Sequence, residues 1–517
     1  MKGTGRLLLG LALLAAPVGC RSANDALGHD ALWHGLPTVP PAPTEGLQQT
    51  SGAGDGSVET FGQPKWHGQE TVPQHDAAPP ADIPIDLPTA LTLAGLDNPT
   101  IALAEEAVRA SEAEQLQARA LLLPTLNAGA SYDWHDGTLQ SSQGIIRNLR
   151  REGVYFGAGA SVVGAGTVTV PGVYLVAHLA DALYEPRIAS DRLAARQFDA
   201  VAVRNAILLD VATGYLALVG AEERLRAVRQ SEEEFDEIAR LTANFAEVGV
   251  RRHGDADRAA SEAALVRAEA ERAGEEVAVA AAELARLLNL DPSARLHGDG
   301  SPVPLLTLVD PRAGLEQLVA TAAANRPEIA AREAELAARR TALRQEKVRP
   351  FLPFLSVGYS AGGFGGEGTA TASRLGQTSA RADFDVAAVW SLQNFGLGNV
   401  ATRRERRAVL NAGLAERDRT LDQVRREVAD AYAAAAATSR DLDAARRQLR
   451  AAQEGYRLDL DRVRRTPRLS RPIELLNSAT LLAAARQEYV RALVGFDQAQ
   501  FRLFVALGQP PLPGDEK

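Results

Sequence analysis

Residues that could carry out chemistry are few in this sequence, and no group of them forms a catalytic motif. The eight histidines are scattered along the chain, and there is a single cysteine. Gly363 to Gly368, GFGGEG, fits the spacing of a dinucleotide-binding loop, but no helix is expected to follow it. A P-loop, a nucleophile elbow and an HExxH motif are all missing. We therefore predict that the protein is not an enzyme and has no cofactor and no metal site.

The cysteine stands at the end of a short apolar segment. Lys2 and Arg6 precede the run LLLGLALLAAPV, which ends just before Gly19 and Cys20. A charged start, a short apolar run and a small residue before the cut are typical of a secretory signal. The arrangement resembles a bacterial lipoprotein signal, in which Cys20 becomes the lipidated first residue, although Pro17 departs from the usual aliphatic residue. A plain secretory signal, or an uncleaved anchor with a buried free cysteine, is the alternative.

Residues 1–19 are thus predicted to be a signal peptide and residues 20–85 a flexible linker. The linker contains PTVPPAPTEG, SGAGDGS and DAAPPADIP, which cannot bury enough apolar surface to fold. Arg21, rather than Asp, follows the cysteine, and by the same resemblance this implies sorting to the outer membrane.

The composition favours closely packed helices and disfavours a nucleic-acid partner. Hydrophobic residues make up 46% of the 517 residues, whereas aromatic ones make up 5%. Alanine and arginine, both good helix formers, are abundant. The net charge is −9, and acidic and basic residues are interspersed along most of the expected helices, which leaves no basic stripe for nucleic acid.

Two stretches change from a helical to a strand-like hydrophobic period at a proline. In RPFLPFLSVGYS, Leu355, Val357 and Tyr359 alternate with small residues after Pro353. LLLPTLNAGASYDW shows the same change after Pro124. A proline lacks an N–H and disfavours the α conformation in the residue before it, so each stretch should join a helix to a strand.

The second stretch is part of a duplication of the whole folded body. Arg326-Pro327 corresponds to Asn98-Pro99 at an offset of 228 residues. We expect a first repeat over 86–304, a second over 305–510 and a tail over 511–517. Each repeat should contain a helix, a strand hairpin, a very long helix and a shorter return helix. In the first hairpin we expect a polar loop between Trp134 and Val154.

The expected strands alternate over about nine to eleven residues, which is the length that a tilted membrane strand needs. Their apolar faces would meet lipid, and their Asp, Arg and Ser faces a wet lumen. Four strands cannot close a barrel, so several protomers would have to contribute strands. A half-buried soluble sandwich is the alternative, but helices of about 60 residues interrupt the strands.

The long helices are predicted over about Leu183 to Ala246 and Gly398 to Arg464. Apolar residues recur in them every seven positions, which is typical of coiled-coil seams. These positions are Val211, Leu218 and Leu225 in the first repeat and Leu421, Val428, Ala435, Leu442, Leu449, Tyr456 and Val463 in the second. Alone, the helices would favour an ordinary coiled-coil scaffold, and the strand hairpins decide against it.

This order of elements, behind a lipoprotein signal, resembles the TolC-type outer-membrane efflux proteins, the outer-membrane factor lipoproteins. The most specific matches are the two helix returns, GVRRHGDADRAASEA from Gly249 and RLSRPIELLNSATLL from Arg468. The resemblance implies a mixed α and β fold in which a homotrimer builds one transmembrane β-barrel, with four strands per protomer, continued by an α-helical coiled-coil barrel. It also implies acidic rings at a periplasmic constriction that opens when partners engage it.

The resemblance places the family's gate positions on Asp255, Glu474 and Asn477. Asn477 is an amide where a second acid is usual, and Arg468 replaces the glycine of the second turn. Three symmetry-related Glu474 carboxylates near one axis would repel one another and hold cations. The simpler interpretation is helix capping. Pro472 fits the first helical position, and Glu474 would be the third residue of the helix, where a negative charge interacts favourably with the helix dipole.

The second return is also rich in arginine, which suggests a docking surface for an acidic partner. The alternative is a solvated loop. The residues predicted to dock a partner are Arg464, Arg465, Arg468 and Arg471.

We therefore predict a lipid-anchored outer-membrane channel that extends into the periplasm as the exit duct of a tripartite efflux or type I secretion system. The resemblance implies a periplasmic adaptor protein and an inner-membrane transporter as its partners. The alternative is a periplasmic coiled-coil adaptor or scaffold lipoprotein without a pore.

Overall fold

The computed structural model describes residues 82–158, 172–249, 252–291, 293–300, 303–366, 377–466 and 472–509. These residues all belong to one compact unit, Asp76–Lys517, with a mixed α and β fold. The predicted signal peptide, Cys20, the linker as far as residue 81 and the tail lie outside the described residues. The last four residues of the expected linker form a strand.

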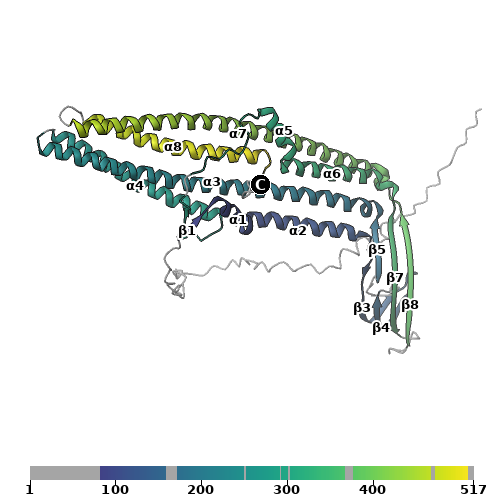
Figure 1. Ribbon diagram of the computed structural model, residues 1–517. Coiled ribbons are helices and arrows are strands. Elements are labelled where there is room, and N and C mark those ends of the chain that lie inside the picture. The colour runs from purple at the N-terminus through teal and green to yellow at the C-terminus, as the bar shows by residue number, and fades with distance from the viewer. Residues whose placement is uncertain are drawn as a thin grey trace, which may run out of the picture. The chain divides into compact units, whose positions relative to one another are not determined.

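The described elements fall into two similar series, which we call the first and second repeats, and each long helix is followed by a return helix (Figure 1). The first repeat consists of β1 (Asp82–Ile85), α1 (Leu87–Asp97), α2 (Pro99–Arg119), η1 (Ala120–Leu122), β2 (Thr125–Leu126), β3 (Gly129–Gln140), β4 (Ile146–Ala158), β5 (Val173–His178), α3 (Leu179–Glu247), α4 (His253–Leu287) and β6 (Arg295–Gly298). The second consists of α5 (Leu315–Asn325), α6 (Pro327–Val348), η2 (Arg349–Phe351), β7 (Phe354–Gly366), β8 (Gln377–Val389), η3 (Gln393–Gly396), α7 (Leu397–Arg465) and α8 (Pro472–Ala506).

The helices begin where local chemistry favours a start. Pro99 and Pro327 occupy first-turn positions of α2 and α6, where a missing N–H costs nothing. The side chain of Asn98 also accepts a hydrogen bond from the N–H of Thr100 at 2.9 Å, which satisfies one of the free donors at the start of α2.

The long helices pack through the heptad positions expected from the sequence. Helix α3 contacts α2, α4, α6 and α8, while α7 packs on α6 and α8. Five of the seven α7 positions are buried, and Leu421 and Leu449 are half-buried. Among the described helices α3 is long and apolar enough to cross a membrane by length and composition alone, but its buried residues pack within the protein.

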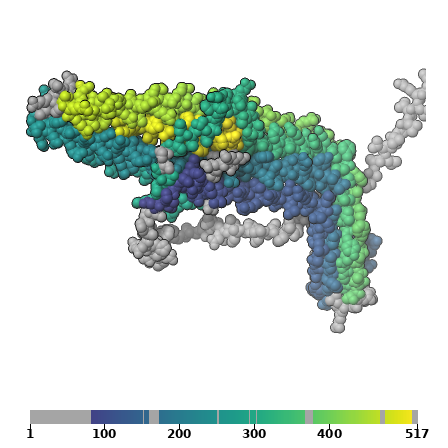
Figure 2. Space-filling model, viewed as in Figure 1, coloured from purple at the N-terminus to yellow at the C-terminus, as the bar shows by residue number. Residues whose placement is uncertain are grey.

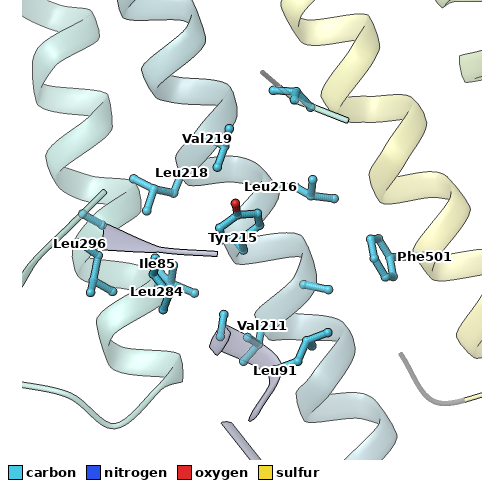
Figure 3. Packing of buried hydrophobic residues seen from close by; sticks show 14 of the residues in the cluster. Ile85, Leu91, Val211, Tyr215, Leu216, Leu218, Val219, Leu284, Leu296 and Phe501 are labelled. Atoms are coloured by element: carbon cyan, nitrogen blue, oxygen red, sulfur yellow. The ribbon is translucent and has the colours of Figure 1, made fainter. Parts of the chain in front are cut away.

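The largest apolar core surrounds the middle of α3. Val211, Leu216 and Leu218 are completely buried there. Side chains from four other helices (α1, α4, α7 and α8) and from β1 and β6 surround them, among them Leu91, Leu284 and Phe501 in Figure 3. Burial of these residues fixes α4 and α8 against the same long helix.

The connection between the repeats is fastened to α8 by side chains. The Asp497 carboxylate accepts a hydrogen bond from the N–H of Leu306 at 2.8 Å, and its second oxygen is buried without a partner in the described chain. Gln500 accepts bonds from the N–H groups of Leu308 and Val309 at 3.3 and 3.4 Å. Burial raises the pKa of Asp497 to about 7, because the charged form is poorly solvated.

Strands β2 to β5, β7 and β8 form one antiparallel sheet at the end of α2, α3, α6 and α7, whereas β1 and β6 pair separately (Figure 1). Strand β7 pairs with β8 along its whole length on one side. On its other side it pairs first with β5 and then with β4. The sheet therefore has six strands by hydrogen bonding, with β2 and β3 pairing with β5 and β4 respectively at its other edge.

The prediction of a polar loop between Trp134 and Val154 is wrong, because most of these residues lie in strands. Strand β3 continues to Gln140 and β4 already begins at Ile146. Polar side chains pair across this extension, as in the ion pair between Arg150 and Asp136 at 3.8 Å. Polar residues are compatible with a strand when no face needs to be buried, so composition alone did not reveal it.

The glycine-rich run is also mainly strand, as far as the structure describes it. Gly363 to Gly366 lie in β7 and pair with residues 377–380 of β8. The next described element after them is strand β8 and not a helix.

The register of the pairs divides the sheet into two chemically different faces. Directly opposed residues of an antiparallel pair point to the same side. One side, which we call the apolar face, carries Ala130, Tyr132, Trp134, Val154, Phe156, Leu175, Leu355, Val357, Tyr359, Phe384, Val386 and Ala388. The opposite side carries Ser131, Asp133, Ser356, Ser360, Arg381, Asp383 and Asp385. The expected alternation of apolar and polar faces is confirmed.

Glycines let aromatic rings lie flat on both faces of β7. A Cβ on Gly362 would stand 2.5 Å from Cε2 of Tyr155, and one on Gly363 would stand 2.6 Å from Cζ of Phe156. These distances are far below van der Waals contact, so the two rings need glycine at these two positions.

A polar cluster joins the strands to the helices. Gln345 donates hydrogen bonds to Asp181 at 2.7 Å and to Glu185 at 2.9 Å, and Arg349 pairs with both Asp181 and Glu346. The cluster ties the start of α3 to the end of α6. At this point both segments of the chain are connected to strands of the sheet.

Candidate functional site

The two helix returns lie together at the end of the long helices farthest from the sheet (Figure 2). Side chains from four helices form one apolar core there, and its members are Phe235, Ile238, Ala259, Ala263, Tyr456, Val463, Leu475, Leu476, Ala479 and Leu482. This core packs the α3–α4 return against the α7–α8 return. The two segments that resembled the family's gate are therefore neighbours within one chain.

Asp255 lies in the first turn of α4, where its N–H donates to the Arg252 carbonyl at 3.1 Å. Its side chain is half-buried and lines a small cavity with Thr242 of α3 and Ile473 and Leu476 of α8. The structure thus brings Asp255 close to the start of α8. A negative charge at a helix N-terminus is also favourable for the dipole, so a capping role is consistent with the same geometry.

Glu474 is the third residue of α8 and is exposed. One of its carboxylate oxygens lies 3.6 Å from Nη1 of Arg462, which also lies 3.6 Å from Asp459. Asn477 is exposed one turn later. Both side chains can therefore face a neighbouring molecule or water, and neither is locked in the apolar core.

Of the four arginines predicted to dock a partner, the structure describes two, and both are paired within the chain. Arg464 pairs with Glu237 of α3, which raises the pKa of the guanidinium, and Arg465 lies 3.7 Å from Asp461. Arg468 and Arg471 lie outside the described residues. Arg465 is 79% exposed, so its weak ion pair leaves it available to a partner.

Sequence reasoning missed the most buried ion pair of this region. Arg486 of α8 forms two hydrogen bonds of 2.7 Å with Glu234 of α3 and one of 3.2 Å with Ser231. The side chains of Arg486 and Glu234 are 11% and 18% exposed. A single arginine inside the apolar run LLAAARQEYV was the available signal.

Tyr456 lies beside this pair in the apolar core. Burial, with the nearby Glu234 and Glu237 carboxylates, raises its pKa to about 12. The phenol is therefore neutral at any physiological pH and acts as a packing residue. Among the described residues no group of three or more His, Cys, Asp or Glu side chains is placed to hold a metal ion.

Comparison with protein families decides the class. The family model for outer membrane efflux proteins matches residues 90–290 and 318–509. The chain belongs to this family. The match covers both repeats, and the efflux class and the outer-membrane location predicted from the sequence are confirmed.

Solved structures share the fold of this efflux protein. The outer-membrane channel OprN aligns with a TM-score of 0.65 at 20% identity over 82% of this chain and 89% of its own. A membrane protein from Pseudomonas aeruginosa gives 0.66 at 22% identity, with coverages of 84% and 97%. The open state of the MtrE outer membrane channel of Neisseria gonorrhoeae gives 0.60 at 18% identity, with coverages of 83% and 91%. A search of curated proteins returned no match.

Proposed function

We propose that this outer-membrane efflux protein is the passive exit duct of a tripartite efflux or type I secretion assembly. The observation that carries the proposal is the two-faced sheet at one end of helices of 69 residues. Such a helix is about 100 Å long at 1.5 Å per residue, far longer than a compact domain needs. A pore-free scaffold would have no use for a sheet with an exposed apolar face.

In this proposal three protomers combine their sheets into one closed barrel. The sheet of a single chain has open edges at β3 and β8, and unpaired edge groups cannot lie in hydrocarbon. A homotrimer is the symmetric solution that the family resemblance implies. The helices of the three chains would form the wall of a tube through the periplasm.

The N-terminal region would add a second attachment to the membrane. We propose that residues 1–19 are removed, that Cys20 is lipidated and that residues 20–85 tether the lipid to the repeats over 86–304 and 305–510. A single acyl chain binds a membrane weakly, so the barrel would supply most of the anchoring.

The proposed partners are a periplasmic adaptor protein and an inner-membrane transporter. The sequence contains no P-loop, so energy for transport must come from another subunit. The exposed end of α7 with Arg464 and Arg465, continued by Arg468 and Arg471, is the proposed docking surface.

The proposed gate consists of Asp255, Glu474 and Asn477. Their support is the position of both helix returns at one end of the helices and the exposure of Glu474 and Asn477. In a trimer, each would occur three times around the axis. Rings of like charge in a narrow opening would attract cations and make the closed state sensitive to salt.

The duct is tested with the purified full-length protein in planar lipid bilayers. We expect discrete conductance steps, and trimers on gels that dissociate on heating. A protein that stays monomeric, forms no conductance and leaves no β-sheet signal in the membrane fraction would support the scaffold instead.

A further inference from the structure

The turn between β8 and α7 holds a phenylalanine in an unusual conformation. Asn394 and Phe395 have left-handed backbones, with φ of 51° and 54°, and Gly396 follows with φ of 88°. Bulky residues rarely adopt this conformation, because Cβ approaches the backbone. The turn is nevertheless well held, since the buried Asn399 side chain accepts a hydrogen bond from the N–H of Gln393 at 3.0 Å.

This strained turn projects the Phe395 ring out of the protein. The residue is 103% exposed, so its ring is not packed against the described part of the chain in return for the strain. A strained, fully exposed aromatic residue is expected only where something outside the chain receives it.

The surroundings of the turn are apolar and continue the apolar face of the sheet. Trp390 follows Phe384, Val386 and Ala388 at the same spacing and is 62% exposed. Its indole N–H donates to the Phe351 carbonyl at 3.3 Å, which fixes it at the junction. Leu392, Leu397 and Phe351 are also exposed. We call these three residues, together with Trp390 and Phe395, the collar.

Cationic side chains follow the collar along α7. Arg403, Arg404 and Arg407 are exposed and form no ion pair with a described residue, whereas Glu405 is the one acid among them. Six to ten residues beyond Leu397 correspond to roughly 9–15 Å along a helix. Aromatic and apolar residues followed by arginines are the sequence of groups met when passing from acyl chains to lipid phosphates.

We propose that Phe395 is an interfacial anchor that inserts into the periplasmic leaflet of the outer membrane, with Arg403, Arg404 and Arg407 at the phosphate level. The inference rests on the outer-membrane location of the family and is independent of gating and docking. The arginines favour lipid over a neighbouring protomer as the occupant, because a protein surface would have to supply three matching carboxylates. The strained turn would set how deeply the sheet lies in the membrane, because it places the Phe395 ring between the last residue of β8 and the arginines of α7.

The test places a nitroxide spin label on Phe395→Cys of the full chain in phosphatidylethanolamine–phosphatidylglycerol vesicles. Relaxation by oxygen reports lipid, and relaxation by a water-soluble nickel chelate reports water. The matched references are Phe384→Cys on the apolar face and Asp385→Cys on the polar face, and the unsubstituted chain gives the background from Cys20.

We expect the label at 395 to resemble the one at 384, with strong relaxation by oxygen and weak relaxation by nickel. Strong relaxation by nickel would overturn the anchor, and so would protection from both agents, which would place the ring in a protein interface. If the two references do not differ, the membrane placement of the sheet fails and the anchor with it. Conductance of the same samples reports on the duct separately.

Discussion

At the scale of single residues, the described chain holds charged groups in three different degrees of burial. Asp497 is fully buried with one unpartnered oxygen, Arg486 and Glu234 are a largely buried pair, and Glu474 is exposed. These environments give the three groups different consequences when they are changed.

Asp497 makes stability depend on pH. Its folded-state pKa, about 7, is above the ordinary value of 3.8, so the folded protein binds a proton more tightly than the unfolded chain. The contribution of Asp497 to stability should be greatest at pH values below its pKa in the unfolded chain, and it should be lost as the pH rises through about 7. We expect Asp497→Asn to be more stable than the wild type at pH 8 and to lose the decline between pH 5 and pH 8. Thermal unfolding of the purified protein at both pH values measures this.

The control for this pH effect is Asp310→Asn, an exposed aspartate in the same connection between the repeats. It should leave the difference between pH 5 and pH 8 unchanged. A parallel loss of stability at both pH values in Asp497→Asn would mean that its hydrogen bond to Leu306, and not its charge, dominates.

The Arg486–Glu234 pair should be far more important than an exposed pair. Arg486→Met leaves a carboxylate in an 18% exposed position, which should cost about 3 kcal/mol of unfolding free energy. Arg491→Met on the same helix breaks an exposed pair with Glu488 and should cost about 0.5 kcal/mol or less. Urea unfolding of the two variants compares them directly, and equal losses would contradict the role assigned to burial.

The proposed gate makes a weaker prediction, because its groups are exposed. The Arg462–Glu474 pair, like other exposed pairs, is worth about 1 kcal/mol at most, which corresponds to about a fivefold change in a two-state equilibrium. We expect Asp255→Ala with Glu474→Ala to raise the open fraction by up to about fivefold and to weaken block by divalent cations. Single-channel recording measures both, and an unchanged double variant would remove both residues from the gate.

The sequence identified the acids of this region but not what surrounds them. The positions of Asp255 and Glu474 follow from short motifs at the starts of α4 and α8. Arg486 and Glu234 are separated by 252 residues, and only the packing of α8 on α3 makes them partners. Pairs of this kind depend on tertiary contacts that local spacing does not encode.

At the scale of elements, the helices were predictable and the strand ends were not. The expected helix from Gly398 to Arg464 differs from α7 by one residue at each end. Gly396 precedes its start, and the heptad positions run to Val463 near its end. The first hairpin was underestimated, since residues 135–140 and 146–152 are polar yet paired. The parallel pairing of β1 with β6 joins four-residue segments more than 200 residues apart and left no local pattern.

The glycines under the aromatic rings give a prediction for the sheet. Gly362→Ala should force the Tyr155 ring from its place, whereas Gly366→Ala meets nothing closer than 3.7 Å. Overpacking typically costs about 1–3 kcal/mol, so Gly362→Ala should lower the temperature at which trimers dissociate on gels, while Gly366→Ala should resemble the wild type. Equal behaviour of the two variants would show that Tyr155 is free to move.

At the scale of the whole molecule, the two ends of the long helices differ in their chemistry. The sheet end carries the apolar face and the Phe395 turn, and the return end carries exposed charges and a four-helix core. About 100 Å of helix separates them by rise. Changes at the return end should therefore affect partners without affecting insertion.

Charge reversal at the return end tests this separation. We expect Arg465→Glu with Arg468→Glu to reduce co-purification of the adaptor and to lower drug tolerance, because a basic docking surface becomes acidic. Trimer yield in the membrane fraction should stay at the wild-type level. Unchanged tolerance and unchanged co-purification would exclude these arginines as docking residues.

The equal lengths of corresponding helices have an evolutionary consequence. Helices α3 and α7 each have 69 residues, and α4 and α8 each have 35. An insertion in one long helix alone would make the two helix returns end at different heights and shift every later heptad out of register with its neighbour. Natural variants with longer helices are therefore expected to carry two matched insertions, one whole heptad in α3 and one in α7.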